Sequence, residues 1–280
     1  MAVTRLTHEA WLERVPELVR ECVQRWDLRL DEPYPAGAAG YAARVELADG
    51  TRAVLKLSYP HRESEHEAAA LELYAGEGAV RLLASDFDRQ AMLLERCEPG
   101  TPVWEVGREA ALDVIVGLLP RLWKPAEEPF RLLAEEAARW AEELPVEWEA
   151  HGRPFERELL DAAVGALLEY GPAQGEQVVL HQDLHGGNVL EAQREPWLAI
   201  DPKPLVGERE FGLAPIVRSF ELGDTCRDVL YRLDRLSSEL GLDRERARGW
   251  TIGQTLAWAV DSHYLPQHVQ TVRWLLDAAP

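Results

Sequence analysis

A short segment of the chain, His181-Gln-Asp-Leu-His-Gly-Gly-Asn188, gathers side chains that could carry phosphate chemistry, and a further carboxylate follows at Asp201. Transfer of a phosphoryl group needs a carboxylate that orients the acceptor hydroxyl, together with hard oxygen ligands that hold Mg²⁺ on the phosphates of a nucleotide. Asp183, Asn188 and Asp201 supply these three groups. We therefore expect phosphoryl transfer from a nucleotide such as ATP, with Mg²⁺, at this segment.

The spacing alone is moderately specific, because His-x-Asp-x-x-x-x-Asn should occur by chance in roughly one of thirty chains of this length. Its context adds to it. Apolar residues 178–180 precede the segment, and residues 189–191 and 197–200 predict a hairpin that ends at Asp201. Upstream, a lysine on a predicted strand follows a glycine-containing loop, in the order that kinases require. Ordinary loop caps are the alternative for the three polar residues.

The upstream lysine is Lys56. Apolar and polar residues alternate from residue 41, Asp49-Gly50 supplies a turn, and alternation resumes over residues 51–57, which predicts a β-hairpin. Successive strand side chains point to opposite faces, so Lys56 projects away from its two leucine neighbours. A cation fixed there can neutralise nucleotide phosphates, and the alternative is an edge-strand lysine in solvent.

These residues need a framework, and the periodicity predicts one in two parts. In the first part, a helical lead-in after Thr7 is followed by the hairpin, a helix over residues 63–74, and strands over residues 80–83 and 91–95. The lead-in is predicted from apolar residues at helical spacing, with Pro16 as a break or restart: Leu12, Val15, Leu18, Val19, Cys22, Val23 and Trp26.

After the turn cluster Glu98-Pro99-Gly100, the best candidate for a linker, the pattern is mostly helical. Helices are predicted over residues 107–119, 130–143 and 155–170 and several times after 214, and the only clear strands are 178–180, 189–191 and 197–200. The predicted fold class is α+β with two lobes. Residues 1–97 form a small antiparallel-sheet lobe with a hinge, residues 98–280 form a large α-rich lobe for catalysis and acceptor binding, and the nucleotide is clamped between them.

The composition excludes several classes of protein. The chain has 280 residues and a formal net charge of −19, and a surface of that sign repels nucleic acid and anionic membranes. Three scattered cysteines suggest neither a disulfide framework nor a zinc site, and fit a reducing cytoplasm. No apolar run is long enough to span a bilayer, and the N-terminus lacks a signal-peptide core. We expect a soluble, cytoplasmic protein whose oligomeric state is left open.

Six segments carry more than local chemistry: Gly37-Ala-Ala-Gly40-Tyr41, Ala53-Val-Leu-Lys56-Leu57, His66-Glu67-Ala68, Leu93-Leu-Glu-Arg-Cys97-Glu-Pro-Gly100, His181 to Asn188, and Ile200-Asp-Pro-Lys203. Through them, and over nearly its whole length, the chain resembles the aminoglycoside phosphotransferase family, most closely its branch of streptomycin 6-kinases and hydroxyurea kinases. The resemblance implies a protein-kinase-like fold. It also implies that Asp183 is the catalytic base, that Asn188 and Asp201 hold magnesium, and that Lys56 grips the α- and β-phosphates of ATP.

Further roles in nucleotide binding are implied by the resemblance. Glu67 would orient Lys56, although Glu63 and Glu65 lie within one helical turn of it. The backbone from Gly37 to Gly40 would cradle phosphate or form an ordinary hairpin loop. The segment from Glu95 to Cys97 would be the hinge whose backbone bonds adenine, with the Cys97 thiol as a buried small hydrophobe and without a chemical role.

Four further residues of the second lobe lie in or near the segments that carry the resemblance. His181 is expected to brace the catalytic segment, and His185 to pack or bond nearby. Lys203 could reach the transferring phosphate or lie on the surface. Gly212 is a departure, because many family members carry Asp at that place.

The acceptor pocket is expected between the catalytic segment and the late helices, with Glu208, Glu210, Trp258 and Asp261 as candidate contacts. Three acidic pairs recur along one helical side and could face a cationic sugar, although a solvated face is the favoured interpretation: Glu127-Glu128, Glu135-Glu136 and Glu142-Glu143. Hydroxyurea is small and neutral and would need no such acids. Streptomycin, hydroxyurea and another small metabolite therefore all stay open as the acceptor that an antibiotic-resistance kinase of this kind would phosphorylate.

Two alternatives belong to other functional classes. A catalytically silent nucleotide-binding module, or pseudokinase, would have no physical need for the complete set of Lys56, Asp183, Asn188 and Asp201. A protein kinase is expected to carry an Ala-Pro-Glu signature that the second lobe lacks. We therefore expect a small-molecule kinase.

Overall fold

The computed structural model describes residues 7–35, 40–125 and 128–278. The chain divides into two compact units. Unit 1 comprises Met1–Gly100 and Glu191–Leu198, and unit 2 comprises Thr101–Leu190 and Ala199–Pro280. Residues 191–198 thus belong with the first part of the chain, although a long stretch of unit 2 precedes them in the sequence.

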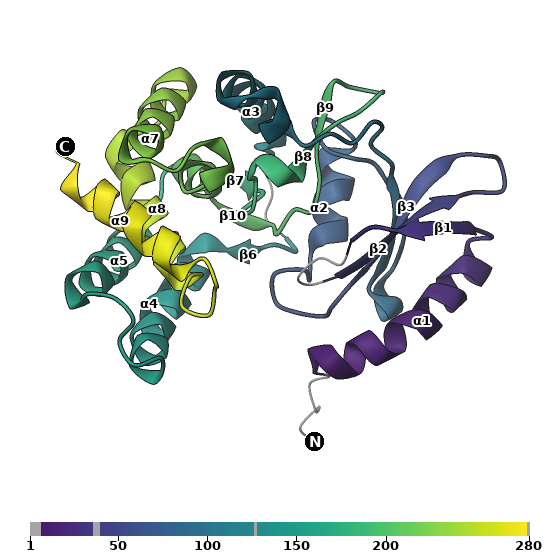
Figure 1. Cartoon of the computed structure of the whole chain (residues 1–280), viewed down its shortest axis with the longest axis horizontal. Coiled ribbons are helices and arrows are strands. Elements are labelled where there is room, and N and C mark those ends of the chain that lie inside the picture. The colour runs from purple at the N-terminus through teal and green to yellow at the C-terminus, as the bar shows by residue number, and fades with distance from the viewer. Residues whose placement is uncertain (1–6, 36–39, 126–127, 279–280) are drawn as a thin grey trace. The chain divides into compact units, whose positions relative to one another are not determined.

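Unit 1 is built on a five-stranded antiparallel sheet with strand order β1-β2-β3-β5-β4 (Figure 1). Its elements are α1 (His8–Arg25), β1 (Arg29–Pro33), β2 (Gly40–Glu46), β3 (Arg52–Ser58), α2 (Glu67–Tyr74), β4 (Leu82–Asp86) and β5 (Ala91–Glu95). The predicted hairpin is confirmed as β2 and β3, and Lys56 lies opposite Ala42 in its register. The central position of β3 holds Lys56 on a strand that is paired on both sides.

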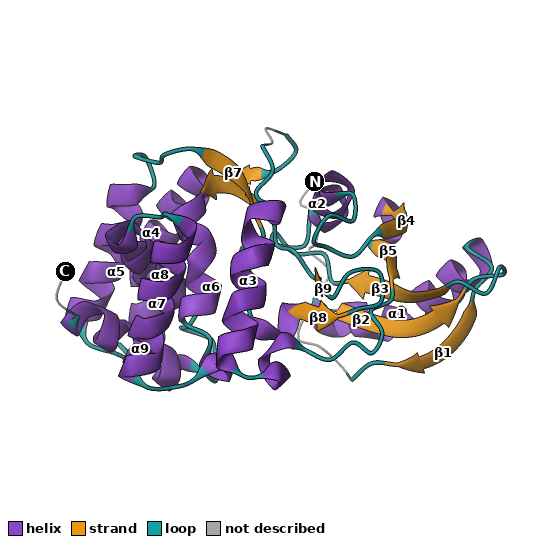
Figure 2. Cartoon of the chain, turned by 90° about the horizontal axis from the view of Figure 1, so that it is seen from above, coloured by secondary structure: helices purple, strands orange, loops and turns teal. Residues whose placement is uncertain are grey.

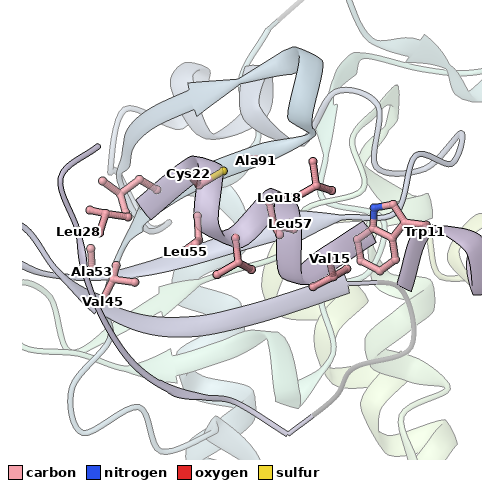
Figure 3. Close-up of a cluster of buried hydrophobic side chains, with 12 residues drawn as sticks. Trp11, Val15, Leu18, Cys22, Leu28, Val45, Ala53, Leu55, Leu57 and Ala91 are labelled. Atoms are coloured by element: carbon pink, nitrogen blue, oxygen red, sulfur yellow. The ribbon is translucent and has the colours of Figure 1, made fainter. Parts of the chain in front are cut away.

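Helix α1 covers one face of this sheet through a cluster of buried apolar residues (Figure 3). The helix runs through Pro16 without a break, so the predicted restart there is wrong. Val15, Leu18, Val19 and Cys22 are buried as predicted. Leu12 is 51% exposed and Trp11 is buried in its place, so the predicted apolar face is wrong at this one position. Burial of this face along the helix outweighs the hydrogen bond that proline cannot donate.

Two boundaries in unit 1 differ from the prediction. Helix α2 begins at Glu67 rather than Glu63, because the Ser64 hydroxyl donates to the carbonyls of Tyr59 and His61 and holds the preceding residues in a turn. Strand β4 begins at Leu82 rather than residue 80, and the Arg194 guanidinium donates to the carbonyls of two residues just before it, Gly76 and Ala79.

Unit 2 is dominated by helices (Figure 2). Its longer helices are α3 (Arg108–Leu122), α4 (Leu133–Ala150), α5 (Arg157–Tyr170), α7 (Cys226–Leu240), α8 (Arg244–Ala257) and α9 (Leu265–Asp277), and α6 (Ala214–Val217) is a single turn. The predicted helical body is confirmed. In the part of the chain that the structure describes, no helix is both long and apolar enough to cross a membrane.

A small sheet lies within this helical body. Strand β10 (Leu205–Glu208) pairs antiparallel with β7 (Gln177–Leu180) and parallel with the two-residue β6 (Arg131–Leu132). Strands β6 and β10 were not predicted from the sequence. Strand β10 is buried along its whole length, and a short strand of that kind shows no polar–apolar alternation. A side chain on Gly207 would place its Cβ only 2.6 Å from Leu133, so the glycine lets α4 pack directly on the strand.

Candidate active site

The segment His181–Asn188, which we call the catalytic loop after its expected role, is a compact loop between β7 and β8 (Val189–Glu191). Strand β8 pairs with β9 (Trp197–Ala199) as predicted. Gln182 adopts a left-handed conformation with φ of 65°. Its carbonyl accepts a hydrogen bond from the buried Gln254 of α8 at 3.3 Å, and the amide of Asp183 donates to the carbonyl of His181 at 2.8 Å. The backbone that carries Asp183 is therefore fixed both by its own turn and by α8.

Asn188 is held in an orientation that suits a cation ligand. Its Nδ2 donates to the carbonyl of Asp183 at 2.8 Å, so its side-chain oxygen is the end left to act as a ligand. The backbone carbonyl of Asn188 accepts a hydrogen bond from the amide of Ile200 at 3.0 Å. This bond holds Asp201, the residue after Ile200, close to Asn188. Asp201 has a left-handed φ of 58°, which turns the chain immediately after β9.

His181 ties the two carboxylate segments together. Its Nε2 bonds the carbonyl of Ile200 at 2.9 Å, and its own carbonyl accepts from the amide of Lys203 at 2.9 Å. Burial lowers the pKa of His181 to about 4, so the ring is neutral and Nε2 carries the proton that it donates. The neutral His181 ring therefore ties the backbone just before Asp201 to the loop that carries Asp183.

Lys203 forms an ion pair with Asp183. Its Nζ lies 2.5 Å from Asp183 Oδ2, and the side chains are 22% and 14% exposed. The same Nζ lies 5.6 Å from the ring centroid of Trp258, and the guanidinium of Arg218 lies 5.0 Å from that centroid. Trp258, expected as an acceptor contact, thus lies between two cations near the catalytic loop.

His185 closes the loop on the other side. Its Nδ1 lies 3.2 Å from a Glu221 oxygen and 3.1 Å from the amide of Gly187. Burial lowers the pKa of His185, but the bond to Glu221 and the charge of Asp183 outweigh it and raise the pKa above its usual value. A Cβ on Gly187 would lie 2.7 Å from Trp104, so the Gly-Gly pair makes room for that indole.

The donor set of the loop fits Mg²⁺ better than a zinc-type metal. Asn188 and Asp201 offer an amide oxygen and a carboxylate, and Mg²⁺ usually takes one or two protein oxygens and completes its shell with phosphates and water. Among the residues that the structure describes, no group of three or more His, Cys, Asp or Glu side chains could hold a metal ion.

In unit 1, Lys56 pairs with a glutamate of α2. Its Nζ lies 2.5 Å from Glu67 Oε1, with the two side chains 16% and 2% exposed. The Ser58 hydroxyl donates to the other Glu67 oxygen at 3.4 Å. Glu65 is 54% exposed and contacts His66, whereas Glu67 lies at hydrogen-bond distance from the lysine.

The other residues of unit 1 that were predicted to contact the nucleotide are the two loop glycines and the hinge residues Glu95 and Cys97. Gly37 lies outside the described residues, and Gly40 begins β2, where an added Cβ would lie 3.0 Å from the carbonyl of Leu57. The Glu95 carboxylate accepts two hydrogen bonds from Arg194, both at 2.8 Å. Burial raises the pKa of the Cys97 thiol to about 12, in keeping with a buried small hydrophobe.

Two of the expected acceptor contacts lie at the far end of β10. In the register with β7, Leu205 lies opposite Leu180, next to the catalytic loop, whereas Glu208 lies opposite Gln177, about 10 Å further along the strand. Glu208 is 1% exposed and forms an ion pair with Arg246 at 2.7 Å. Together with Glu210 it lines a polar pocket of about 410 Å³ there.

The remaining acidic candidates are occupied elsewhere. Asp261 is exposed and lies 2.6 Å from His151 Nε2. Among the acidic pairs, Glu127 lies outside the described residues, and Glu136 is buried between Arg131 and Arg139, whereas Glu135 is exposed. The pairs therefore do not form one continuous acidic face.

Several positioning residues escaped the sequence analysis. Trp104, Glu221 and Gln254 contact the catalytic loop from three separate elements, and Arg194 reaches Glu95 from the tip of the β8–β9 hairpin. None stands next to a motif or repeats at a fixed spacing. Glu221 and Gln254 are polar residues with buried or half-buried partners, which only the fold makes visible.

Comparison with known proteins places these features in a family. A model described as aminoglycoside/hydroxyurea antibiotic resistance kinase matches residues 25–265. The chain is 42% identical over 255 residues to streptomycin 6-kinase of Streptomyces glaucescens, covering 89% of this chain and 83% of the relative. It is 43% identical over 262 residues to hydroxyurea phosphotransferase of Kitasatospora aureofaciens, covering 90% of this chain and 75% of the relative.

Solved structures show the same fold at much lower identity. Choline kinase LicA from Streptococcus pneumoniae matches with a TM-score of 0.68 at 15% identity, covering 95% of this chain and all of that one. A complex of aminoglycoside phosphotransferase APH(4)-Ia with ADP and hygromycin B matches with a TM-score of 0.62 at 13% identity, covering 93% and 99%. The predicted kinase-like fold is thus confirmed, and the chain is a phosphotransferase that belongs to the family of aminoglycoside/hydroxyurea antibiotic resistance kinases.

Proposed function

We propose that the chain transfers the γ-phosphoryl group of ATP to a hydroxyl group of a streptomycin-type aminoglycoside or of hydroxyurea. The observation that supports this most directly is the bonding of the catalytic loop. Asn188 is bonded to the carbonyl of Asp183 at 2.8 Å and to the amide before Asp201 at 3.0 Å. One carboxylate for the acceptor and two oxygen ligands for Mg²⁺ are therefore carried by one hydrogen-bonded unit.

In the proposed reaction, Asp183 accepts a hydrogen bond from the acceptor hydroxyl and takes up its proton. A bond forms between the acceptor oxygen and the γ-phosphorus while the bond from that phosphorus to the β-phosphate oxygen breaks, which leaves ADP. Asn188 and Asp201 would hold Mg²⁺, which would supply positive charge against that of the phosphates. Lys56, oriented by Glu67, binds the α- and β-phosphates.

Both acceptors belong to the proposal because the relatives named for streptomycin and for hydroxyurea are nearly equally similar, at 42% and 43% identity. Acidic residues close to Asp183 would favour a polycation, yet Glu208 and Glu210 lie at the far end of β10. All three cysteines are free, which is compatible with action in the reducing cytoplasm, where either antibiotic would have to be intercepted.

A screen of ATP consumption tests the proposal. Purified protein is incubated with ATP and Mg²⁺ and with streptomycin, other aminoglycosides or hydroxyurea in turn, and phosphorylated product is identified by mass spectrometry. We expect turnover with streptomycin or hydroxyurea. Asp183→Asn should lower kcat by about a thousandfold or more while ATP binding stays largely intact.

Asp161→Asn is a matched control, because Asp161 is 61% exposed and pairs with Arg157 on the surface of α5. Its turnover should equal that of the unmodified protein. Unchanged turnover in Asp183→Asn, or no phosphorylation of any of these acceptors, would contradict the proposal.

A further inference from the structure

We infer that Lys203 is a catalytic residue whose ammonium group contacts the phosphoryl group while it is being transferred. The inference rests on the proposed function and adds a residue to it. Nothing in the composition of a turn after a strand requires a lysine there. Lys203 lies close to Asp183, is held by several contacts, and is one of only three lysines in the chain.

The ammonium group of Lys203 lies close to the carboxylate of the proposed base. Lys203 Nζ lies 2.5 Å from Asp183 Oδ2, which leaves the other oxygen of that carboxylate for the acceptor hydroxyl. A hydroxyl bonded to that oxygen would lie roughly 3–6 Å from Nζ, and the attacked phosphorus approaches the hydroxyl to roughly 3–3.5 Å. An oxygen of the transferred group would then come within hydrogen-bond reach of Nζ. The ammonium can thus touch the base and the phosphoryl group together.

Lys203 is held in place by contacts of both its backbone and its side chain. Its amide donates to the carbonyl of His181 at 2.9 Å, so its backbone is part of the same hydrogen-bonded unit as the catalytic loop. The ring centroid of Trp258 lies 5.6 Å from Lys203 Nζ. The guanidinium of Arg218 is the second cation beside this ring. An ammonium placed beside a fixed aromatic ring and a carboxylate is already oriented before the substrates bind, which is the condition for effective electrostatic catalysis.

Lysine is much rarer than arginine in this chain. The chain holds 30 lysine and arginine residues, and only Lys56, Lys124 and Lys203 are lysines. In a chain that otherwise uses arginine, one of these three lysines, Lys56, binds phosphate in the proposed mechanism, and another, Lys203, is paired with the proposed base. Lysine serves as a small point charge, whereas the planar guanidinium of arginine is larger and needs a forked partner.

The charge of the whole protein favours a further cation at this position. With a net charge of −19, the chain as a whole repels a nucleotide triphosphate. Asp183 and Asp201 add two carboxylates at the loop itself. A cation must offset them locally where negative charge gathers on the transferred group, and Lys203 is the cation bonded to the base.

Binding of a transition-state analogue tests the inference without relying on turnover. ADP with Mg²⁺ and fluoroaluminate imitates the transferring phosphoryl group, and ADP alone does not. In Lys203→Met we expect ADP to bind with an affinity within threefold of the original, whereas ADP with fluoroaluminate should bind at least tenfold more weakly. Lys124→Met is the matched control and should bind both as the unmodified protein does. In turnover, Lys203→Met should lower kcat about a hundredfold with KM for ATP nearly unchanged.

A second measurement needs no change at Lys203. Selective ¹³C labelling of lysine should give three side-chain signals, which Lys124→Met and Lys56→Met assign. The Lys203 signal should shift when fluoroaluminate is added to the ADP complex. Equal binding of the analogue by Lys203→Met and the unmodified protein, or a Lys203 signal that does not move, would overturn the inference while leaving the proposed function standing. Failure of the unmodified protein to bind ADP at all would overturn both.

Discussion

Replacement of Glu67 by glutamine tests the most buried charge in the nucleotide-binding part of the proposal. The change keeps the size of the side chain and removes its charge. Lys56 then faces a neutral oxygen where it now meets a carboxylate at 2.5 Å. We expect lower stability and weaker nucleotide binding, because the carboxylate both compensates the ammonium and fixes its direction.

The size of the effect follows from burial. A charge-assisted hydrogen bond contributes about 1.5–3 kcal/mol, and breaking a fully buried ion pair costs about 3–5 kcal/mol. Glu67 is 2% exposed, but Lys56 is 16% exposed and can regain some water when its partner is neutral. We therefore expect the free energy of unfolding to fall by about 2 kcal/mol and the affinity for ATP to fall about tenfold, equivalent to about 1.4 kcal/mol.

Urea unfolding measures the first quantity, and calorimetric titration with a non-hydrolysable ATP analogue measures the second. Glu65→Gln is the matched control, because this nearby glutamate is 54% exposed and its loss should change the free energy of unfolding by less than about 0.5 kcal/mol. If Glu65→Gln and Glu67→Gln behave alike, or if Glu67→Gln binds the analogue as tightly as the unmodified protein, the assignment of Glu67 as the residue that orients Lys56 is wrong.

Three further predictions concern unit 2. Gly187→Ala should lower kcat about tenfold and cost about 1–3 kcal/mol in urea unfolding, because its Cβ would lie 2.7 Å from Trp104; adding Trp104→Leu should restore part of both, and no restoration would refute the steric cause. Arg232→Met should cost about 3–5 kcal/mol, because the buried guanidinium donates to the carbonyls of Val217, Leu222 and Gly223; a loss below about 1 kcal/mol would contradict this. The pKa of His181 is lowered to about 4, so the unfolded chain binds a proton between pH 6.5 and 4 that the folded chain does not. Its share of the stability should therefore fall with falling pH, by about 2 kcal/mol at pH 5, and His181→Gln should show a shallower pH dependence in urea unfolding.

Residue types and their spacing were enough to predict the class of reaction and the main helices and strands. Asp183, Asn188 and Asp201 were predicted as site residues because phosphoryl transfer needs these side-chain types within a few residues of strand ends, and their spacing along the chain fits that need. The β2–β3 hairpin and the long helices were predictable for a similar reason. Their periodicity reflects one buried face, which is a local property of the sequence.

Tertiary structure decided which residues meet. Three glutamates precede or begin α2, and only the turn at Ser64 and the pairing of β3 bring Glu67 to Lys56. Glu208 was predicted as a candidate acceptor contact, yet it ends a strand buried on both faces and pairs with Arg246. The partner of a charged side chain depends on contacts between segments far apart in the chain, and neither composition nor period encodes them. Lys203 is the clearest case, because two residues after Asp201 it could have faced water, and the fold sets it 2.5 Å from Asp183.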